Sequence, residues 1–181
     1  NADILTFNGG VTHTNGITQT AGIINTSNDP ITLGNVTLLA STPYNTSATS
    51  TSGDITLADV TGAGNDLILT TGNVDGANVV ITGFTGGGDI TLNATDEATF
   101  GANAFTVGSF DINSPRTSAS FTGDLNATNF LHDAGSYNLS FTGSSTTIGN
   151  AQTFTNTGTL QLGNAAADEM TFNGGVVATA P

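Results

Sequence analysis

A pentapeptide that occurs twice, 35 residues apart, constrains this chain more than any other feature. Gly-Asp-Ile-Thr-Leu begins at residue 53 and again at residue 88, and two short apolar runs lie between the copies, at residues 67–69 and 79–81. Short apolar runs separated by Gly, Asn and Asp are typical of strands and turns. We therefore expect strands to begin near residues 55, 67, 79 and 90, about one every 12 residues.

The composition supports strands and argues against helices. The 181 residues include 47 Thr and Ser, 24 Gly and 20 Asn, but no Lys, one Arg, two Glu and one Met. A soluble helix normally places long charged side chains on its wet face, and these are almost missing here. Thr, Val, Ile and Phe favour strands, whereas Gly, Asn and Asp favour turns. The regular spacing of apolar residues argues against disorder.

The second half of the chain repeats with aromatic residues in place of aliphatic ones. Ser-Phe-Thr-Gly occurs at residues 120–123 and again at residues 140–143. Repeat distances of roughly 20 to 24 residues, each holding two or three strands, predict a β-solenoid whose stacked coils share one narrow core. About eight coils would form a rod on the order of 40 Å long, at the usual spacing of neighbouring strands. A β-sandwich is the alternative, because it also has short, evenly spaced strands.

A low-complexity patch interrupts this pattern. Residues 41–52 read STPYNTSATSTS and show no apolar periodicity apart from Tyr44. Such a stretch predicts an exposed loop, which could serve as a contact surface or be an insertion that the scaffold tolerates.

The two ends of the chain carry nearly the same sequence. Residues 2–14 read ADILTFNGGVTHT and residues 167–179 read ADEMTFNGGVVAT, with nine of thirteen positions identical at an offset of 165. Two explanations remain open. The chain could be one unit of a longer tandem array with a period of about 165 residues. Alternatively, both ends of a free-standing subunit present the same coil, so that copies stack end to end.

These motifs resemble those of a known class of repeat proteins. Gly-Asn-Asp-Leu-Ile-Leu at residues 64–69 and the two Gly-Asp-Ile-Thr-Leu copies are similar to coils of bacterial filamentous-haemagglutinin-like adhesins and autotransporter passenger domains. The resemblance covers residues 53–92, and the rest of the chain only in texture. It implies a right-handed parallel β-helix, exported to the cell surface, that acts as an adhesin or a stalk. After Phe100 the sequence departs from this pattern.

The charge distribution excludes some classes of partner. Fourteen acids against Arg116 give a net charge of −13, so the basic footprint that nucleic acids and anionic lipids require is missing. No apolar run reaches the length of a membrane span. The chain has no Cys, which fits a bacterial or archaeal surface protein, or a cytosolic one. The scattered acids predict a soluble surface that resists association.

One stretch suggests a calcium site. Residues 61–69, TGAGNDLIL, fit a calcium-binding nonapeptide except that Thr61 replaces the first Gly. Asp66 would be the ligand, but working sites need several consecutive copies, and here one imperfect copy is present. A turn that uses Gly and Asp for its backbone shape is the competing interpretation, and the same two interpretations apply to Asp89. No metal site is therefore predicted.

Catalysis has no support in the sequence. His13 and His132 are 119 residues apart, and the adjacent acids Asp96 and Glu97 would point to opposite faces of a strand. No serine lies in a nucleophile-elbow motif. Thr-x-Thr motifs, which can bind ice when they form even ladders, occur at irregular intervals. We expect no enzyme, no catalytic residue and no cofactor.

The expected function is structural. The sequence predicts a stiff segment of a secreted, extracellular surface or filament protein, namely a stalk, fibre or adhesin. Its expected partners are copies of itself, or neighbouring repeats of the same chain, joined end to end. The alternative is a module that binds a carbohydrate or a host surface through residues 41–52 or through a Thr-rich face.

Overall fold

The computed structural model describes residues 3–46, 49 and 53–178, which form strands and turns. No helix in this part of the chain has the length and hydrophobicity needed to cross a membrane. The described strands are β1 (Ile4–Phe7), β2 (Val11–Thr20), β3 (Ile23–Thr26), β4 (Ile31–Leu38), β5 (Thr42–Asn45), β6 (Ile55–Thr61), β7 (Leu67–Thr70), β8 (Val79–Thr85), β9 (Ile90–Phe100), β10 (Phe105–Ile112), β11 (Pro115–Phe121), β12 (Leu125–His132), β13 (Asn138–Phe141), β14 (Ser145–Ile148), β15 (Gln152–Phe154), β16 (Leu160–Leu162), β17 (Glu169–Phe172) and β18 (Val176–Ala178).

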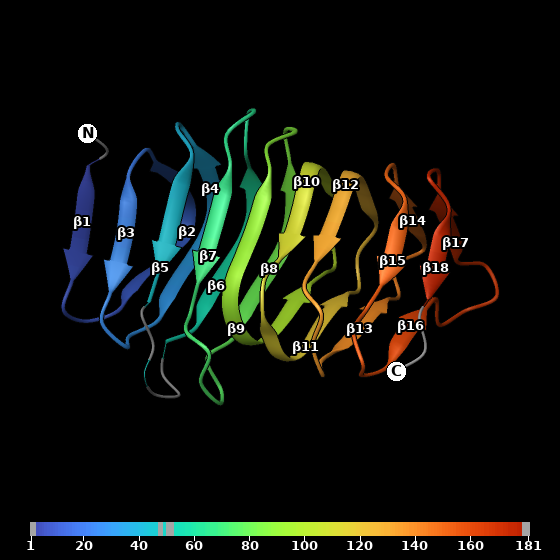
Figure 1. Cartoon of the computed structure of the whole chain (residues 1–181). Coiled ribbons are helices and arrows are strands. Elements are labelled where there is room, and N and C mark those ends of the chain that lie inside the picture. The colour runs from blue at the N-terminus through green and yellow to red at the C-terminus, as the bar shows by residue number, and fades with distance from the viewer. Residues whose placement is uncertain (1–2, 47–48, 50–52, 179–181) are drawn as a thin grey trace.

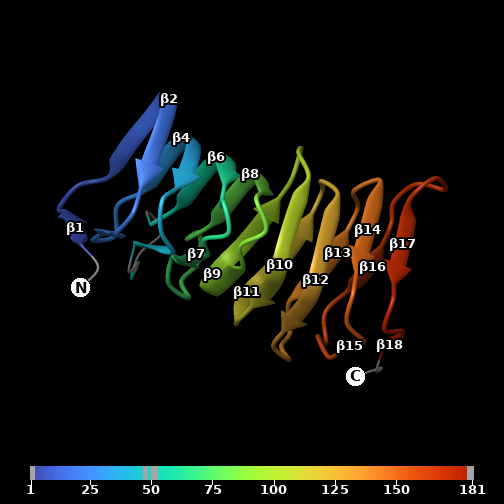
Figure 2. The same ribbon diagram turned by 90° about the horizontal axis from the view of Figure 1, so that it is seen from above.

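These strands wind into a β-solenoid of about eight turns. Every described strand pairs in parallel with strands about one coil away in the sequence. Figure 1 shows the coils side by side, with β1 at one end of the rod and β18 at the other, and Figure 2 shows the same order from above. The prediction of a solenoid is thereby confirmed over the alternative of a sandwich.

Each coil contributes three strand segments, which define three faces. The long strand β4 illustrates the corner between two of them: its buried side chains are at positions 31 and 33 at first and at 36 and 38 afterwards, with the buried Gly34 at the change. This shift in phase marks a bend, because inward side chains alternate along a straight strand.

Face 1 contains residues 11–13, 31–33, 55–57, 79–81, 98–100, 119–121, 139–141 and 160–162. Face 2 contains residues 17–20, 36–38, 60–61, 84–85, 105–107, 125–127, 146–148 and 170–172. Face 3 contains residues 4–7, 23–26, 42–45, 67–70, 90–92, 110–112, 130–132, 152–154 and 176–178.

The predicted strand starts are correct, but the two Gly-Asp-Ile-Thr-Leu copies do not stack on each other. Strands β6, β7, β8 and β9 begin at residues 55, 67, 79 and 90. Ile55 pairs with Ile31 and Val79 on face 1. Ile90 pairs with Leu67 and Phe110 on face 3. The two copies are therefore equivalent in local structure and lie on different faces.

Coil length varies along the rod. Paired residues are 18 positions apart at Thr18 and Val36 and 25 positions apart at Thr42 and Leu67, a wider range than the predicted 20 to 24. The strand segments keep their parallel register through most of this variation, so the corners absorb the extra residues.

The core changes from aliphatic to aromatic along the axis, as the sequence indicates. Ser120 pairs with Ser140 and Phe121 with Phe141, so the two Ser-Phe-Thr-Gly copies stack in register. The rings of Phe121 and Phe141 are stacked with centroids 5.1 Å apart, and Phe100 continues the column 4.9 Å from Phe121. All three side chains are fully buried. Identical residues on successive coils therefore build a continuous aromatic column.

The prediction of an exposed loop over residues 41–52 is wrong at its start. Residues 42–45 form β5, which pairs with β3 and β7, and the side chain of Tyr44 is fully buried. The Tyr44 hydroxyl and Thr20 Oγ1 are hydrogen-bonded at 2.9 Å. The neighbouring Thr42 and Thr46 are also buried, and their hydroxyls donate to backbone carbonyls. Residues 47, 48 and 50–52 of the predicted loop lie outside the described residues.

Candidate functional site

The acids considered for calcium join neighbouring coils through hydrogen bonds. Asp66 Oδ1 accepts the backbone N–H of Asp89 at 3.0 Å, and Asp66 Oδ2 accepts the hydroxyl of Ser41 at 3.2 Å. Asp89 Oδ1 accepts the backbone N–H of Ser109 at 2.7 Å. Each carboxylate therefore accepts a donor at the corner of the next coil, which would otherwise lack a partner. Within residues 3–46, 49 and 53–178, no cluster of three or more His, Asp or Glu could hold a metal ion.

The two histidines lie in unrelated surroundings. His13 is exposed on face 1 of the first described coil, and its Nδ1 is 2.7 Å from Thr18 Oγ1. His132 lies near the other end on face 3, where its ring stacks on Phe154 and its Nδ1 is 2.7 Å from the Tyr137 hydroxyl. The structure therefore does not bring the two imidazoles together.

A buried carboxylate supports one corner of the rod. Asp96 is almost fully buried and accepts the backbone N–H of Gly76 at 2.8 Å and the hydroxyl of Thr117. Arg116 Nη1 lies 3.8 Å from Asp96 Oδ1 and 3.6 Å from Asp75 Oδ1. The Gly76 hydrogen bond, followed by that from Thr117 and the charge of Arg116, holds the pKa of Asp96 below its usual range. This cluster fastens the residues before β8 to the next two coils.

Replacement of this carboxylate should weaken the fold and remove part of its acid sensitivity. We expect Asp96→Asn to lower the free energy of unfolding at pH 7 by about 1–3 kcal/mol, because a charged acceptor of buried donors is lost. Because the pKa of Asp96 is lower in the folded state than in the unfolded state, its carboxylate stabilises the folded protein at pH values above the unfolded pKa. This contribution is lost as pH falls through the pKa of the folded state. The deficit of the variant should therefore shrink below about pH 4. Urea denaturation at pH 7 and pH 3 measures this deficit.

Asp111→Asn, on the outer side of face 3, is the control and should change stability by less than about 0.5 kcal/mol at either pH. An equal deficit at both pH values for Asp96→Asn would contradict the assignment.

Threonines that are scattered in the sequence form a ladder on face 2. The outward middle position of this face is Thr in six of its eight coils, with Gln19 and Asn126 in the other two. The six threonines are Thr37, Thr61, Thr85, Thr106, Thr147 and Thr171. Their side chains do not hydrogen-bond within the described part of the chain, so the hydroxyls are available to solvent or to a ligand. The ladder cannot be recognised from Thr-x-Thr pairs within one strand, because the alignment of threonines from successive coils depends on coil length.

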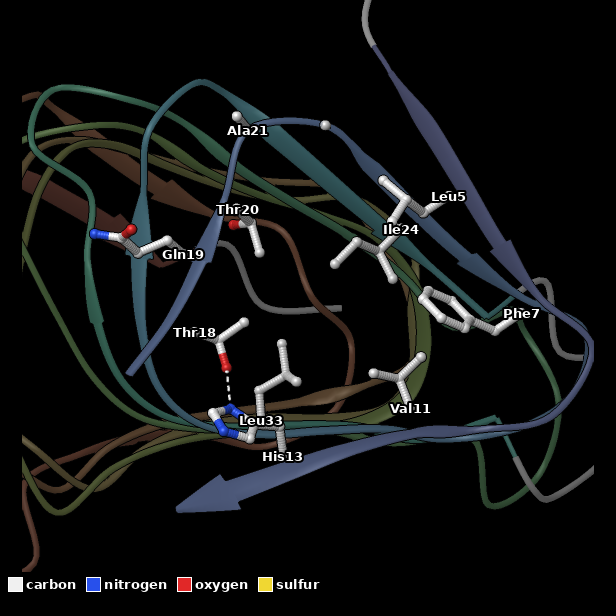
Figure 3. Close-up of a pocket in the computed structure, with 11 residues that line it drawn as sticks. Leu5, Phe7, Val11, His13, Thr18, Gln19, Thr20, Ala21, Ile24 and Leu33 are labelled. Atoms are coloured by element: carbon white, nitrogen blue, oxygen red, sulfur yellow. Dashed lines mark hydrogen bonds between the residues drawn. The ribbon is translucent and has the colours of Figure 1, made fainter. Parts of the chain in front are cut away.

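The first described coil leaves an apolar hollow at one end of the rod. The hollow has a volume of about 260 Å³ and is lined chiefly by Leu5, Phe7, Val11, Ile24 and Leu33. Figure 3 shows these side chains converging on it from β1, β2, β3 and β4, with His13 and Thr18 at its other side. Leu5 is 47% exposed and Phe7 is 38% exposed, although both occupy inward positions. Exposed core positions and unpaired strand edges are features of a solenoid surface that another coil can cover.

The last described coil leaves apolar side chains at the other end. Leu162, Val176 and Val177 are exposed, and Met170 and Phe172 are partly buried against the core. Phe172 ends a chain of aromatic contacts, with its ring 6.0 Å from that of Phe154. Both ends of the rod therefore present apolar core positions beside strand edges that are unpaired within the described residues.

The charges lie mainly between the two ends. Residues 4–28, 134–167 and 170–181 contain no Asp, Glu, Lys or Arg, and eleven of the fourteen acids lie between Asp29 and Asp133. Like charges repel over roughly 10 Å at ordinary salt concentrations. Two copies of the rod can consequently approach end to end with less repulsion than side by side.

These observations define the chain as a parallel β-solenoid whose conspicuous surfaces are its ends and its threonine ladder. No protein-family model, no curated protein and no solved structure matches the chain.

Proposed function

We propose that this chain is a non-enzymatic structural segment of a secreted surface or filament protein. In this role it serves as a stiff rod, in a stalk, fibre or adhesin, that continues or stacks end to end. The observation that carries the proposal is the contrast between the two apolar ends, which carry three of the fourteen acids, and the midsection, which carries eleven. A coil that covers each end would bury the core positions and satisfy the strand edges.

The interior supports a mechanical role. Inward positions on all three faces are mainly apolar, and the buried Thr46 donates to a backbone carbonyl of the next coil. The corner acids Asp66 and Asp89 accept hydrogen bonds from the next coil. The resulting ladder of backbone hydrogen bonds runs along the rod with about 4.8 Å per coil. A load along the axis is then shared among three strand segments in every coil.

An extracellular location is part of the same proposal. The chain contains no Lys and one Arg, so a protease that cleaves after basic residues finds a single site. The resemblance of residues 53–92 to exported bacterial adhesins supports this location. The acidic surface keeps neighbouring rods apart and soluble.

Association through the ends can be tested with the intact chain. Small-angle scattering and light scattering over a dilution series should show particles that lengthen with concentration while their cross-section stays constant. Phe7→Asp should abolish this lengthening, because it places a charge in the apolar hollow. Leu131→Asp is the matched control, since Leu131 is 49% exposed on the side of the rod, and it should leave the lengthening unchanged. A single monomeric size at every concentration would contradict association through the ends.

The second candidate function is binding of a glycan or a host surface, and the threonine ladder favours it. Six unbonded hydroxyls in register, on β-branched side chains with few rotamers, form an ordered row of donors and acceptors. A glycan array probed with the native chain and with Thr61→Val and Thr85→Val tests it. Valine keeps the shape and removes the hydroxyls, so binding should fall; binding that is unaffected by these substitutions would rule out the ladder as the site.

A further inference from the structure

The end of the rod near β18 shows how the repeated end segment sits on a coil. Strand β17 pairs with β14 in the register Glu169 to Ser145 and Phe172 to Ile148. Strand β18 pairs with β15, with Val176 opposite Gln152. Residues 169–178 therefore cover the edges of β14 and β15, and the inward Met170 and Phe172 pack against the core.

The matching segment at the other end has the same pattern but is covered on one edge only. Strand β1 pairs with β3 and β2 with β4, whereas the opposite edges of β1 and β2 are unpaired within the described residues. Leu5 and Phe7 occupy the inward positions that Met170 and Phe172 occupy in the other copy. Here they are exposed and line the hollow in Figure 3.

The turn shared by the two segments suits different corners of the coil. Asn-Gly-Gly joins face 3 to face 1 after Phe7, and it joins face 2 to face 3 after Phe172. Gly175 has a φ of 86°, whereas Gly10 does not adopt a positive φ. Two consecutive glycines can take either conformation, so the same Asn-Gly-Gly sequence can turn either corner.

From these observations we infer that, in copies of this chain joined head to tail, β1 and β2 of one copy take the place of β17 and β18 of the copy before it, so that their unpaired edges dock on β14 and β15 of that preceding copy. The inference rests on the proposed rod function and names the contact that the rod uses. Leu5 then lies over Thr146, Phe7 over Ile148 and Val11 over Gln152, in the register seen for the second segment. The hollow is filled by the side chains that face it from that coil.

The docking has a geometric consequence. Along the chain, face 3 is followed by face 1 and then by face 2. The path from β1 on face 3 to β17 on face 2 therefore makes seven complete turns and then continues over face 1 to face 2. A second unit that begins where residues 167–179 lie is therefore rotated by one face relative to the first. Successive units turn by about a third of a revolution, and their threonine ladders wind around the rod instead of lying along one side.

A graft in the intact chain tests the docking. The substitutions Glu169→Ile, Met170→Leu, Val177→Thr and Ala178→His convert residues 167–179 into a copy of residues 2–14. If the two segments dock in the same way, the grafted chain keeps its melting temperature to within about 3 °C and its end segment stays protected from a protease of broad specificity. The control Met170→Asp with Phe172→Asp should release the segment. A grafted segment that is cleaved as fast as this control would overturn the inference.

The rotation is tested by a crosslink in a two-unit chain in which residues 1–165 are followed directly by a complete second copy. The protein contains no Cys, so introduced cysteines report only on each other. Ser145→Cys in the first copy and Ile4→Cys in the second should form a disulfide, because adjacent strands bring Cα atoms within bonding range. Thr153→Cys in the first copy is the partner expected if the second copy keeps the same face. Crosslinking through Thr153 and not through Ser145 would overturn the rotation.

Failure of the intact chain to lengthen with concentration, together with a successful graft, would instead count against assembly through free ends.

Discussion

Phe121→Ala is expected to lower the free energy of unfolding by about 3–5 kcal/mol. The ring is fully buried, stacked between Phe100 and Phe141 and in edge contact with Phe110, whose centroid is 4.9 Å away. Removing it leaves a cavity in the middle of the aromatic column, and neighbouring coils cannot close it without breaking their backbone ladder. Urea denaturation monitored by circular dichroism measures the change.

The control for this prediction is the adjacent residue. Ser120 lies on the same strand with its side chain outward, paired with Thr99 and Ser140. Ser120→Ala should change stability by less than about 0.5 kcal/mol. In a solenoid each coil contacts only its neighbours, so a large loss at Phe121 should also make the two halves of the rod unfold at different urea concentrations. A loss below about 1 kcal/mol would contradict the close packing of the column.

Alkaline pH is expected to destabilise the rod by about 2 kcal/mol between pH 10 and pH 12 through the buried hydroxyl of Tyr44. Burial raises the pKa of Tyr44 from its ordinary value of 10.0 to about 12, against a smaller lowering by the Thr20 hydrogen bond. Above pH 10 the unfolded chain loses this proton while the folded chain keeps it. Stability is therefore complete below pH 10, falls as pH rises to 12 and then levels off for this group.

Tyr44→Phe separates this effect from general alkaline unfolding. The variant loses the hydroxyl and its bond to Thr20, which should cost about 1 kcal/mol at pH 8. It should then lose much less further stability than the native chain between pH 10 and pH 12. Burial also raises the pKa of Tyr137, so both proteins are expected to lose stability through this group from pH 10 upward, and this loss continues above pH 12. Parallel stability curves for variant and native chain would show that Tyr44 is accessible to water. The measurement is denaturation across pH, with phenolate absorbance as a second readout.

The sequence predicted the strands well because their inward residues alternate with polar ones. Ile55 and Leu57, or Phe121 and Leu139, are recognisable as inward positions from local pattern alone. The exposed loop at residues 41–52 was wrong at Thr42–Asn45 because the inward neighbours of Tyr44 are threonines. Their hydroxyls bond to carbonyls inside the coil, so polar residues occupy core positions there.

The assignment of strands to the three faces could not be predicted from the sequence, for a different reason. An alternating strand reads the same on any of the three faces, so the repeated Gly-Asp-Ile-Thr-Leu could not reveal that its copies lie on faces 1 and 3. The threonine ladder was hidden for the same reason, since it depends on coil lengths that vary from coil to coil. The two end segments were recognisable because the same residues recur in the same order. The strand on which they dock follows only from the pairing of β17 with β14.

The variation in coil length has a consequence for how such a rod can be elaborated. At the passage from face 3 to face 1, the chain runs from the end of β7 at Thr70 to the start of β8 at Val79. Elsewhere on this corner the chain passes from Thr26 to Ile31 or from Phe7 to Val11 in far fewer residues. One longitudinal ridge therefore accepts added sequence while the three sheets keep their pairing. A peptide tag or a binding epitope placed there would project from the rod at a known position along its axis and at a known angle around it.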